Sequence, residues 1–283
     1  MIVLEHHSAM LIVLCDLVFV NVNLRGGLRM SVAIITGASS GLGAEYARQL
    51  STKKRVDEIW AIARRIDRLE ALQKELSTPV RIFQMDLVVE ADMERFRKTL
   101  EEEKPDVAYL IHAAGFGKIG TYKQIDRKAS MMMVQLNCGA AIDITESVIP
   151  YMRKKSRILE IASTAAFQPF QGLNVYAASK AFLLRYSRAL GVELFGTGIT
   201  VTAVCPYWIK DTEFIPVAGE TKSDAIRHFA FASKKKNVVA VSLFFAEKGF
   251  PVCTPSVISS IHRVSSILPD SVLQLIWSGL RRL

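Results

Sequence analysis

The sequence predicts a single α/β domain in which a doubly wound parallel sheet of about seven strands carries helices on both faces. Short β-rich apolar runs alternate with segments long enough for helices, and a glycine-rich turn follows the first run. The chain contains no internal repeat and no linker that would divide it into two domains. Repeated βα units with right-handed crossovers favour this topology.

Each strand is expected where β-branched and other apolar residues form a short run. These runs are Val32–Thr36, Glu58–Ala63, Val80–Met85, Val107–Ala113, Arg157–Ala162 and Ile199–Val204. Helices are expected in the segments between them, which are Gly41–Ser51, Arg65–Leu76, Ala91–Glu103, Lys123–Met152 and Val175–Leu194. Ligands of such a sheet bind beyond the carboxyl ends of the strands, so the residues that follow each strand are the candidate site.

The two ends of the chain fall outside this pattern. Residues 1–29 form an apolar leader that is too short and too polar for a membrane span. We expect the native fold to start at Met30; a membrane-surface anchor or an extra packed element are the alternatives. The main domain then covers 30–254. Residues 255–283 predict two amphipathic helices separated at Pro269, acting as a packed lid or, through Trp277, Arg281 and Arg282, as a membrane-surface contact.

Charge and cysteine content narrow the partners and the compartment. The net charge of +9 suits nucleic acid, an anionic membrane or a phosphorylated small molecule, but no basic stretch is interleaved with stacking aromatics, which disfavours nucleic acid. The four cysteines (Cys15, Cys138, Cys205 and Cys253) lie far apart and form no metal-type cluster with histidines. We therefore expect reduced thiols, a cytoplasmic protein and no metal site.

The first strand leads into the turn Thr36–Gly43, TGASSGLG, and directly into a helix. Glycines allow positive φ and close approach of a pyrophosphate, while the helix N-terminus offers unpaired N–H groups. This is the Rossmann-type arrangement for binding a dinucleotide. The turn residues expected to contact it are Gly37, Ser39, Ser40, Gly41 and Leu42.

The second strand indicates which dinucleotide binds. NAD sites place a carboxylate about 20 residues after the glycines, whereas Arg64 and Arg65 follow this strand. Two guanidiniums suit a 2′-phosphate, so NADP(H) is expected over NAD(H). Asp86, at the end of the third strand, is either an acceptor for the adenine amino group or a helix cap.

Tyr176 and Lys180 lie four residues apart on one predicted helix face. A nearby ammonium favours the phenolate form of tyrosine, which would make Tyr176 an acid or base near neutral pH. A surface pair is the plain alternative.

TGASSGLG, Asn137 on the long fourth helix, Ser163 after the fifth strand and the YAASK of Tyr176–Lys180 together resemble the short-chain dehydrogenase/reductase superfamily, over residues 30 to 254. The resemblance implies that Tyr176 exchanges a proton with the substrate oxygen and that Ser163 orients that oxygen. Lys180 would bind the nicotinamide ribose and lower the Tyr176 pKa, and Asn137 would hold a water that relays protons to Lys180. It further implies cofactor contacts, which we place at Leu87, Ala114, Gly115, Tyr176, Lys180, Pro206, Ile209 and Thr212.

Two departures from the family pattern are visible. The common NNAG appears as His112-Ala113-Ala114-Gly115, so an asparagine that usually ties strands together is missing. After the sixth strand, Pro206-Tyr207 replaces a frequent Pro-Gly and Thr212 comes one residue late.

The segments beside the expected cleft are unusually apolar, which predicts a bulky hydrophobic carbonyl or secondary alcohol as substrate. The residues concerned are Phe167, Pro169, Phe170, Leu173, Tyr207, Trp208, Phe214 and Ile215. Met131–Met133 favour packing or a subunit interface over a binding box. The segment Ser233–Lys236 is expected to start a solvated helix.

Our main hypothesis is an NADP(H)-dependent oxidoreductase for a hydroxysteroid-type molecule, working as a homo-oligomer paired through the long fourth and fifth helices. One alternative is a 3-oxoacyl reductase in which Lys234–Lys236 meet an acidic carrier or coenzyme A. A second is a non-catalytic NADP(H)-binding regulator, against which the set of Asn137, Ser163, Tyr176 and Lys180 argues.

Overall fold

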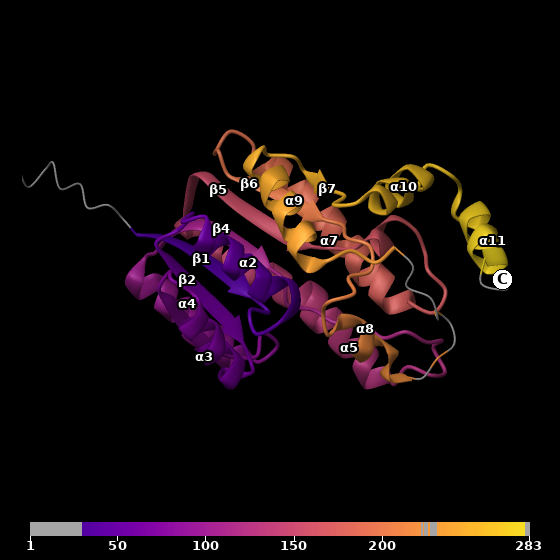
Figure 1. The fold of residues 1–283 in the computed structure, drawn as a ribbon, viewed down its shortest axis with the longest axis horizontal. Helices are drawn as coiled ribbons and strands as arrows, with labels where there is room; N and C mark the ends of the chain where they lie inside the picture. Colours follow the sequence, from indigo (N-terminus) through magenta and orange to yellow (C-terminus); the bar gives the residue numbers. More distant parts are fainter. Residues whose placement is uncertain (1–29, 222, 224–225, 227–230, 281–283) are drawn as a thin grey trace, which may run out of the picture. The chain divides into compact units, whose positions relative to one another are not determined.

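The fold is a seven-stranded sheet with helices on both sides, described in a computed structural model for residues 30–221, 223, 226 and 231–280 (Figure 1). All neighbouring strands are parallel and their order is β3-β2-β1-β4-β5-β6-β7, which confirms the predicted doubly wound α/β class. The strands are β1 (Ser31–Thr36), β2 (Glu58–Ala63), β3 (Val80–Gln84), β4 (Asp106–His112), β5 (Met152–Ile161), β6 (Thr200–Val204) and β7 (Val252–Cys253). The predicted leader, residues 1–29 with Cys15, lies outside the described residues.

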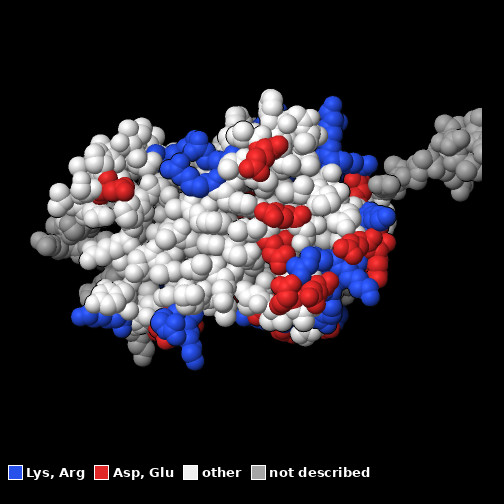
Figure 2. Space-filling model, turned by 180° about the vertical axis from the view of Figure 1, so that it is seen from behind, with Lys and Arg blue, Asp and Glu red and all other residues white. Residues whose placement is uncertain are grey.

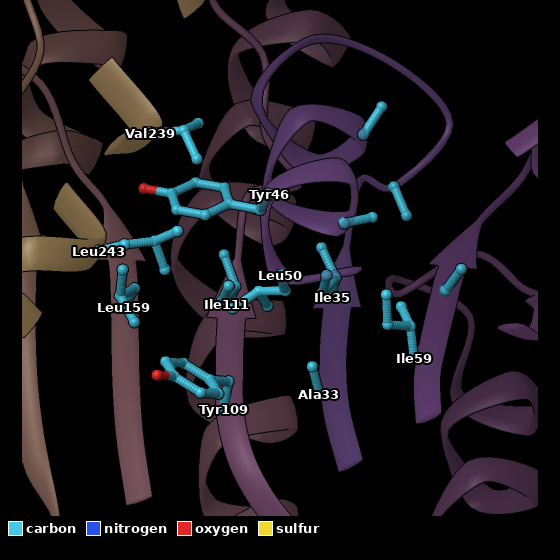
Figure 3. Packing of buried hydrophobic residues seen from close by; sticks show 14 of the residues in the cluster. Ala33, Ile35, Tyr46, Leu50, Ile59, Tyr109, Ile111, Leu159, Val239 and Leu243 are labelled. Carbon is cyan, nitrogen blue, oxygen red and sulfur yellow. The ribbon is translucent and has the colours of Figure 1, made fainter. Parts of the chain in front are cut away.

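One face of the sheet is covered by α2 (Gly41–Thr52), α3 (Ile66–Glu75) and α9 (Lys235–Glu247). Figure 3 shows Tyr46 of α2 between strand residues such as Ile111 and the α9 residues Val239 and Leu243. The Tyr46 hydroxyl is fully buried and lies 2.5 Å from Ser242 Oγ, so this contact joins two helices that are far apart in sequence.

The other face is covered by α4 (Glu90–Glu103), α6 (Ala140–Val148) and α7 (Asn174–Glu193). Trp60, Phe83 and Phe96 form an aromatic group there, with ring centroids 5.0 to 6.3 Å apart. Trp60 and Phe96 on one face and Tyr46 on the other are buried, and burial stabilises the fold by roughly 25 cal/mol per Å² of apolar surface. This burial is the main contribution that holds the sheet between its helices.

The helical segment predicted over Lys123–Met152 is confirmed as one continuous helical run, but it starts at Arg127 and is not a regular α-helix. The structure has α5 (Arg127–Val134), a π-helical turn at Gln135–Gly139, α6, and a 3₁₀ turn (Ile149–Tyr151) that leads directly into β5. Pro150 lies in that last turn, where it donates no N–H to a continuing α-helix. π turns insert one extra residue and often occur at functional sites.

The C-terminal part begins after β6. It contains α8 (Phe214–Ala218) and a 3₁₀ turn (Gly219–Thr221). It ends with α10 (Val257–Ser265) and α11 (Asp270–Leu280), which confirms the two amphipathic helices predicted around Pro269. Arg281, Arg282 and the side chain of Trp277 lie outside the described residues, so the membrane-contact alternative remains a prediction. Within 30–221, 223, 226 and 231–280, no helix combines the length and apolarity needed to cross a membrane.

The remaining features of the fold are the distribution of charged side chains, the state of the cysteines and the placement of potential metal ligands. On the face that Figure 2 shows, acidic and basic side chains are interspersed at one side and the middle is largely uncharged. Cys138, Cys205 and Cys253 are buried and are not paired in disulfides. The described residues hold no group of three potential metal ligands.

Close packing at Gly43 generates a stability prediction. A Cβ at this position would lie 2.3 Å from the carbonyl oxygen of Gly37, so α2 packs on the turn only if residue 43 is glycine. We expect Gly43→Ala to lower the free energy of unfolding by about 1–3 kcal/mol, in chemical denaturation followed by circular dichroism. Gly139→Ala is the control, because a Cβ at that helical position meets nothing within 4 Å. Equal stability of the two variants would contradict the packing argument.

Candidate active site

A cavity of about 1040 Å³ opens at the carboxyl ends of the strands, where the fold class places ligands. Every residue that the sequence predicted for the cofactor lines it, and so do Ser163, Tyr176 and Lys180. Asn137 is the exception, because it is fully buried behind the wall. The loops after β1, β2, β3, β4, β5 and β6 therefore converge on one space, although they are far apart in sequence.

The glycine turn has the geometry that a phosphate cradle needs. Gly37 and Gly41 have φ of +67° and +55°, a region that favours glycine. A Cβ on Gly37 would lie 2.9 Å from the backbone of Ala113 and Ala114, so the turn passes tightly over the end of β4. Ser40 precedes α2 without capping it through its side chain, and the first residues of α2 line the cavity. A helix N-terminus facing a cleft suits a pyrophosphate.

The two arginines after β2 have different surroundings. Arg65 donates from Nη2 to Ser40 Oγ at 2.8 Å and from Nε to Ser39 Oγ at 3.3 Å, so it is part of the glycine-turn wall. Arg64 is mostly exposed, with Nη1 3.6 Å from an Asp86 carboxylate oxygen. Of the pair, Arg65 is therefore the better placed for an anionic group in the cavity.

The alternative that Asp86 caps a helix is wrong. The cap residue of α4 is Val89, and it makes no side-chain cap bond. Asp86 Oδ1 instead accepts from Val88 N at 3.3 Å in a local turn. The Asp86 side chain remains at the cavity wall, where it can accept a further hydrogen bond.

Tyr176 lies near the start of α7, and its side chain is almost completely buried. Burial raises the pKa of Tyr176 to about 12, although a hydrogen bond with Ser163 works in the opposite direction. In the protein alone the Tyr176 pKa is thus higher than usual, against the lowering that the sequence suggested. A tyrosine in this state holds its proton at neutral pH and can donate it. Ser163 also accepts a hydrogen bond from Ala165 N at 3.1 Å, which caps the following 3₁₀ turn.

Lys180 brings a buried ammonium beside Tyr176. Its Nζ donates to the carbonyl oxygen of Ile161 at 2.7 Å and lies 5.8 Å from the centre of the Tyr176 ring. Burial lowers the pKa of Lys180 to about 8, and the negative charge of Glu160 partly opposes this shift. The ring and the ammonium therefore share one buried corner of the cavity, and the surface-pair alternative does not hold.

Asn137 occupies the π turn and connects three segments. Its Nδ2 donates to Phe116 O and to Ser179 Oγ, both at 3.0 Å, and its Oδ1 accepts from Phe116 N at 3.1 Å. These bonds fix the loop after β4 against α7. A Cβ on Gly115 would lie 2.8 Å from Asn137 Oδ1 and 3.5 Å from Lys180 Nζ, so that loop passes close to both.

Two buried titratable residues were not singled out as functional by the sequence pattern. His112 and Glu160 are register partners on β4 and β5 and are both fully buried. Glu160 accepts from the Thr145 hydroxyl at 2.8 Å, and burial raises its pKa. His112 Nδ1 lies 3.2 Å from Thr36 Oγ1, so the histidine links β4 to β1 in place of the missing asparagine. Burial lowers the His112 pKa to about 3, so this side chain is neutral.

The outer part of the cavity is apolar. Of the eight predicted substrate-side residues, five line it: Phe170, Leu173, Tyr207, Trp208 and Phe214. Phe167 packs against the core instead. The sequence predicts that Met131–Met133 serve packing or a subunit interface. Met133 is fully buried, as packing requires, but Met132 lines the cavity. Lys234–Lys236 are not in the wall; α9 starts there, as predicted.

Helix α10 supplies one side of the cavity. His262 lies in the wall, with its ring 5.3 Å from Tyr207 and its Nδ1 3.1 Å from Gln168 Nε2. Ser259 accepts from Tyr207 N at 3.2 Å, which attaches α10 to the loop after β6. The first of the two predicted C-terminal helices thus contacts the site through the buried Ser259 and His262, whereas the predicted apolar stripe residues Val257, Ile261 and Val264 are exposed.

The comparisons with known proteins agree with this geometry. A family model described as short chain dehydrogenase matches residues 31–222. The NADP-dependent 3-hydroxy acid dehydrogenase YdfG of Salmonella typhi is 33% identical over 192 residues, which is 66% of this chain and 75% of that enzyme.

Solved structures show the same likeness. A short-chain dehydrogenase from Sphingobium yanoikuyae in complex with NADPH has a TM-score of 0.71 and 28% identity, covering 88% of this chain and 95% of that one. The bulky-bulky ketone specific alcohol dehydrogenase from Comamonas testosteroni has a TM-score of 0.68 and 26% identity, with coverage of 88% and 94%. The fold, the cavity at the strand ends and the family match lead to one conclusion: the chain is an oxidoreductase that belongs to the short chain dehydrogenase family.

Proposed function

We propose that this protein uses NADPH to reduce a bulky, apolar ketone to a secondary alcohol, and that it catalyses the reverse oxidation with NADP⁺. The observation that carries the proposal is one cavity in which a buried Tyr176–Lys180 corner lies between a glycine turn with Arg65 and an aromatic outer wall. Within this class we favour a hydroxysteroid-type substrate, because a rigid apolar ring system would pack against the aromatic wall of the cavity.

Arg65, Ser39 and Ser40 would hold the 2′-phosphate, and the start of α2 would hold the pyrophosphate. When bound, the reduced nicotinamide supplies the hydride that goes to the carbonyl carbon. Two relatives carry the same cofactor in their descriptions, one as NADP-dependent and one in complex with NADPH.

Tyr176 supplies the proton in reduction. Its hydroxyl gives H⁺ to the carbonyl oxygen as the hydride reaches the carbon, so the ketone gains one hydrogen at each atom and becomes the alcohol. Ser163 orients the oxygen, and Lys180 stabilises the phenolate that remains on Tyr176. Asn137 acts as a positioning residue, because its bonds to Phe116 and Ser179 fix the loop and the helix that hold this corner.

A 3-hydroxy or 3-oxo acid is a second candidate substrate. Lys118 lines the cavity, and YdfG is named for 3-hydroxy acids. Lys118 already donates to the carbonyl oxygen of Val217 at 2.9 Å and pairs with Glu220, so a substrate carboxylate would have to compete for it. A substrate panel of bulky ketones, 3-ketosteroids, 3-oxo acids and 3-oxoacyl thioesters separates the two candidates.

The role of Tyr176 is tested by its phenylalanine variant. We expect purified protein to oxidise NADPH with at least one bulky ketone of the panel, followed by absorbance at 340 nm. Tyr176→Phe should lower kcat by about 10²–10⁴-fold, because the proton donor is lost. Tyr186→Phe is the control, since Tyr186 is on the same helix and does not line the cavity. Turnover by Tyr176→Phe equal to that of the control would contradict the mechanism.

The role of Arg65 is tested by cofactor binding. Arg65→Ala should weaken NADPH binding by about 10–100-fold in calorimetry, because a charge-assisted contact to the 2′-phosphate is lost. NADH, which has no such phosphate, should change less than about threefold. Arg95→Ala, at an exposed ion pair on α4, is the matched control. Equal losses for NADPH and NADH would assign Arg65 a structural role only.

The charge of Lys180 generates a pH prediction. Because burial lowers the Lys180 pKa to about 8, kcat for reduction should fall as the pH rises through that value. Tyr176 keeps its proton there, since its pKa is about 12. In Glu160→Gln the fall should move to lower pH, because the charge of Glu160 raises the Lys180 pKa. A wild-type rate that stays constant to pH 10 would refute the assignment of Lys180, and a Glu160→Gln profile that does not move would show that Glu160 is uncharged there.

A further inference from the structure

The loop after β6 folds back over the glycine turn. A Cβ on Gly41 would lie 3.7 Å from the Thr212 side chain, so the two segments are in contact. The loop is held on its other side by α9, because Asp211 Oδ1 accepts from Lys235 N at 2.7 Å. These contacts hold Asp211 and Thr212, and the next residue, Glu213, lies beside the arginines that follow β2.

The carboxylate of Glu213 binds two of these arginines. One oxygen accepts from Arg65 Nη1 at 2.9 Å, and the other accepts from Arg68 Nη1. These bonds, with a smaller contribution from Ser40, lower the pKa of Glu213 to about 2. The group is therefore ionised at every pH at which the protein would work, and it is an anion fixed at the basic end of the cavity.

Glu213 accepts a hydrogen bond from Arg65, the residue that the proposed function assigns to the 2′-phosphate of the cofactor. Arg65 faces Ser39 and Ser40 with its other nitrogens, and all of these residues line the cavity. Carboxylates and phosphates are both preferred bidentate acceptors of arginine. The internal carboxylate and a 2′-phosphate would therefore compete for one donor.

Glu213 is also the residue at which α8 begins, although its side chain does not cap the helix. Phe214 follows directly, and its ring lies 5.4 Å from that of Tyr176. The far end of α8 is held separately, because Ile119 N donates to Ala218 O at 2.8 Å and Lys118 pairs with Glu220. Releasing Glu213 would remove one of the contacts that hold the Phe214 end of the helix, which Thr212 Oγ1 and the Tyr176 ring also contact, and would leave the Ala218 end attached.

We propose that Glu213 is a specificity-determining residue that occupies Arg65 until a 2′-phosphorylated adenosine displaces it, and that this exchange loosens α8 over the substrate cavity. The inference rests on the proposed function, because it takes the Arg65 end of the cavity to be the 2′-phosphate site. Glu213 lowers affinity for every ligand with that phosphate and leaves unphosphorylated adenosine ligands unaffected.

The test uses adenosine 2′,5′-bisphosphate and AMP as probes in calorimetry, which requires no turnover. Glu213→Gln should bind the bisphosphate about tenfold more tightly than wild type does, with AMP changed less than about twofold. Glu220→Gln is the matched control, because it removes one negative charge at the other end of α8. An unchanged or weaker bisphosphate affinity of Glu213→Gln would overturn the inference. Equal gains in the two carboxylate variants would also overturn it, as a general charge effect.

A second measurement uses the wild-type chain. In hydrogen–deuterium exchange, the bisphosphate should accelerate exchange of the α8 amides of Phe214, Ile215, Val217 and Ala218, and AMP should not. Slower or unchanged exchange with the bisphosphate would reject the displacement of Glu213. If wild type does not prefer the bisphosphate to AMP, the proposed NADP(H) site itself fails. If it does and Glu213→Gln gains nothing, only the role of Glu213 fails.

Discussion

Burial of the Lys180 ammonium is the constraint on which the rest of the site depends. A buried charge is costly unless hydrogen bonds and an opposite charge accompany it. The protein supplies the Ile161 carbonyl at the end of β5, and Glu160 on the same strand adds an opposite charge when it is ionised, although burial raises the Glu160 pKa. The Ile161 bond requires α7 to pack closely on β5. The Gly115 loop completes the enclosure, because it passes so close to Asn137 that a Cβ has no room there, and it lies within contact distance of Lys180.

The same enclosure explains the properties of Tyr176. A phenol buried beside an ammonium, a serine and aromatic rings stays protonated in the protein alone, which suits a donor to a carbonyl oxygen. Burial thus serves two purposes: it removes water from the reacting corner and it brings the Lys180 pKa into the range where enzymes work. His112 is neutral and stands where the family usually has an asparagine. It lies in register with Glu160 on the neighbouring strand of the same sheet.

Most of the fold and the cofactor wall could be predicted, because they follow from local patterns. Strand β2 was expected at Glu58–Ala63 and is found there, and the glycine turn and Arg65 lie at fixed distances from strand ends. What failed or was missed depends on tertiary contacts. The π turn that carries Asn137 does not alter apolar periodicity enough to be seen. In the sequence, a glutamate such as Glu160 within a strand suggests a side chain that faces solvent. It is buried because this sheet is covered on both faces and has no solvated side. The pairing of Glu213 with Arg65 joins residues 148 positions apart. The catalytic set was identified through family resemblance, since an i,i+4 pair alone is common.

The central claim is that this cavity transfers a hydride from NADPH to the carbonyl carbon of a bulky apolar ketone. The most direct measurement is mass spectrometry of the alcohol formed from such a ketone and NADPH deuterated at both C4 positions of the nicotinamide. The account predicts one deuterium in each product molecule, on the carbinol carbon, with the hydroxyl hydrogen derived from water. An unlabelled alcohol, or no alcohol from any bulky ketone while the protein binds NADPH, would contradict it.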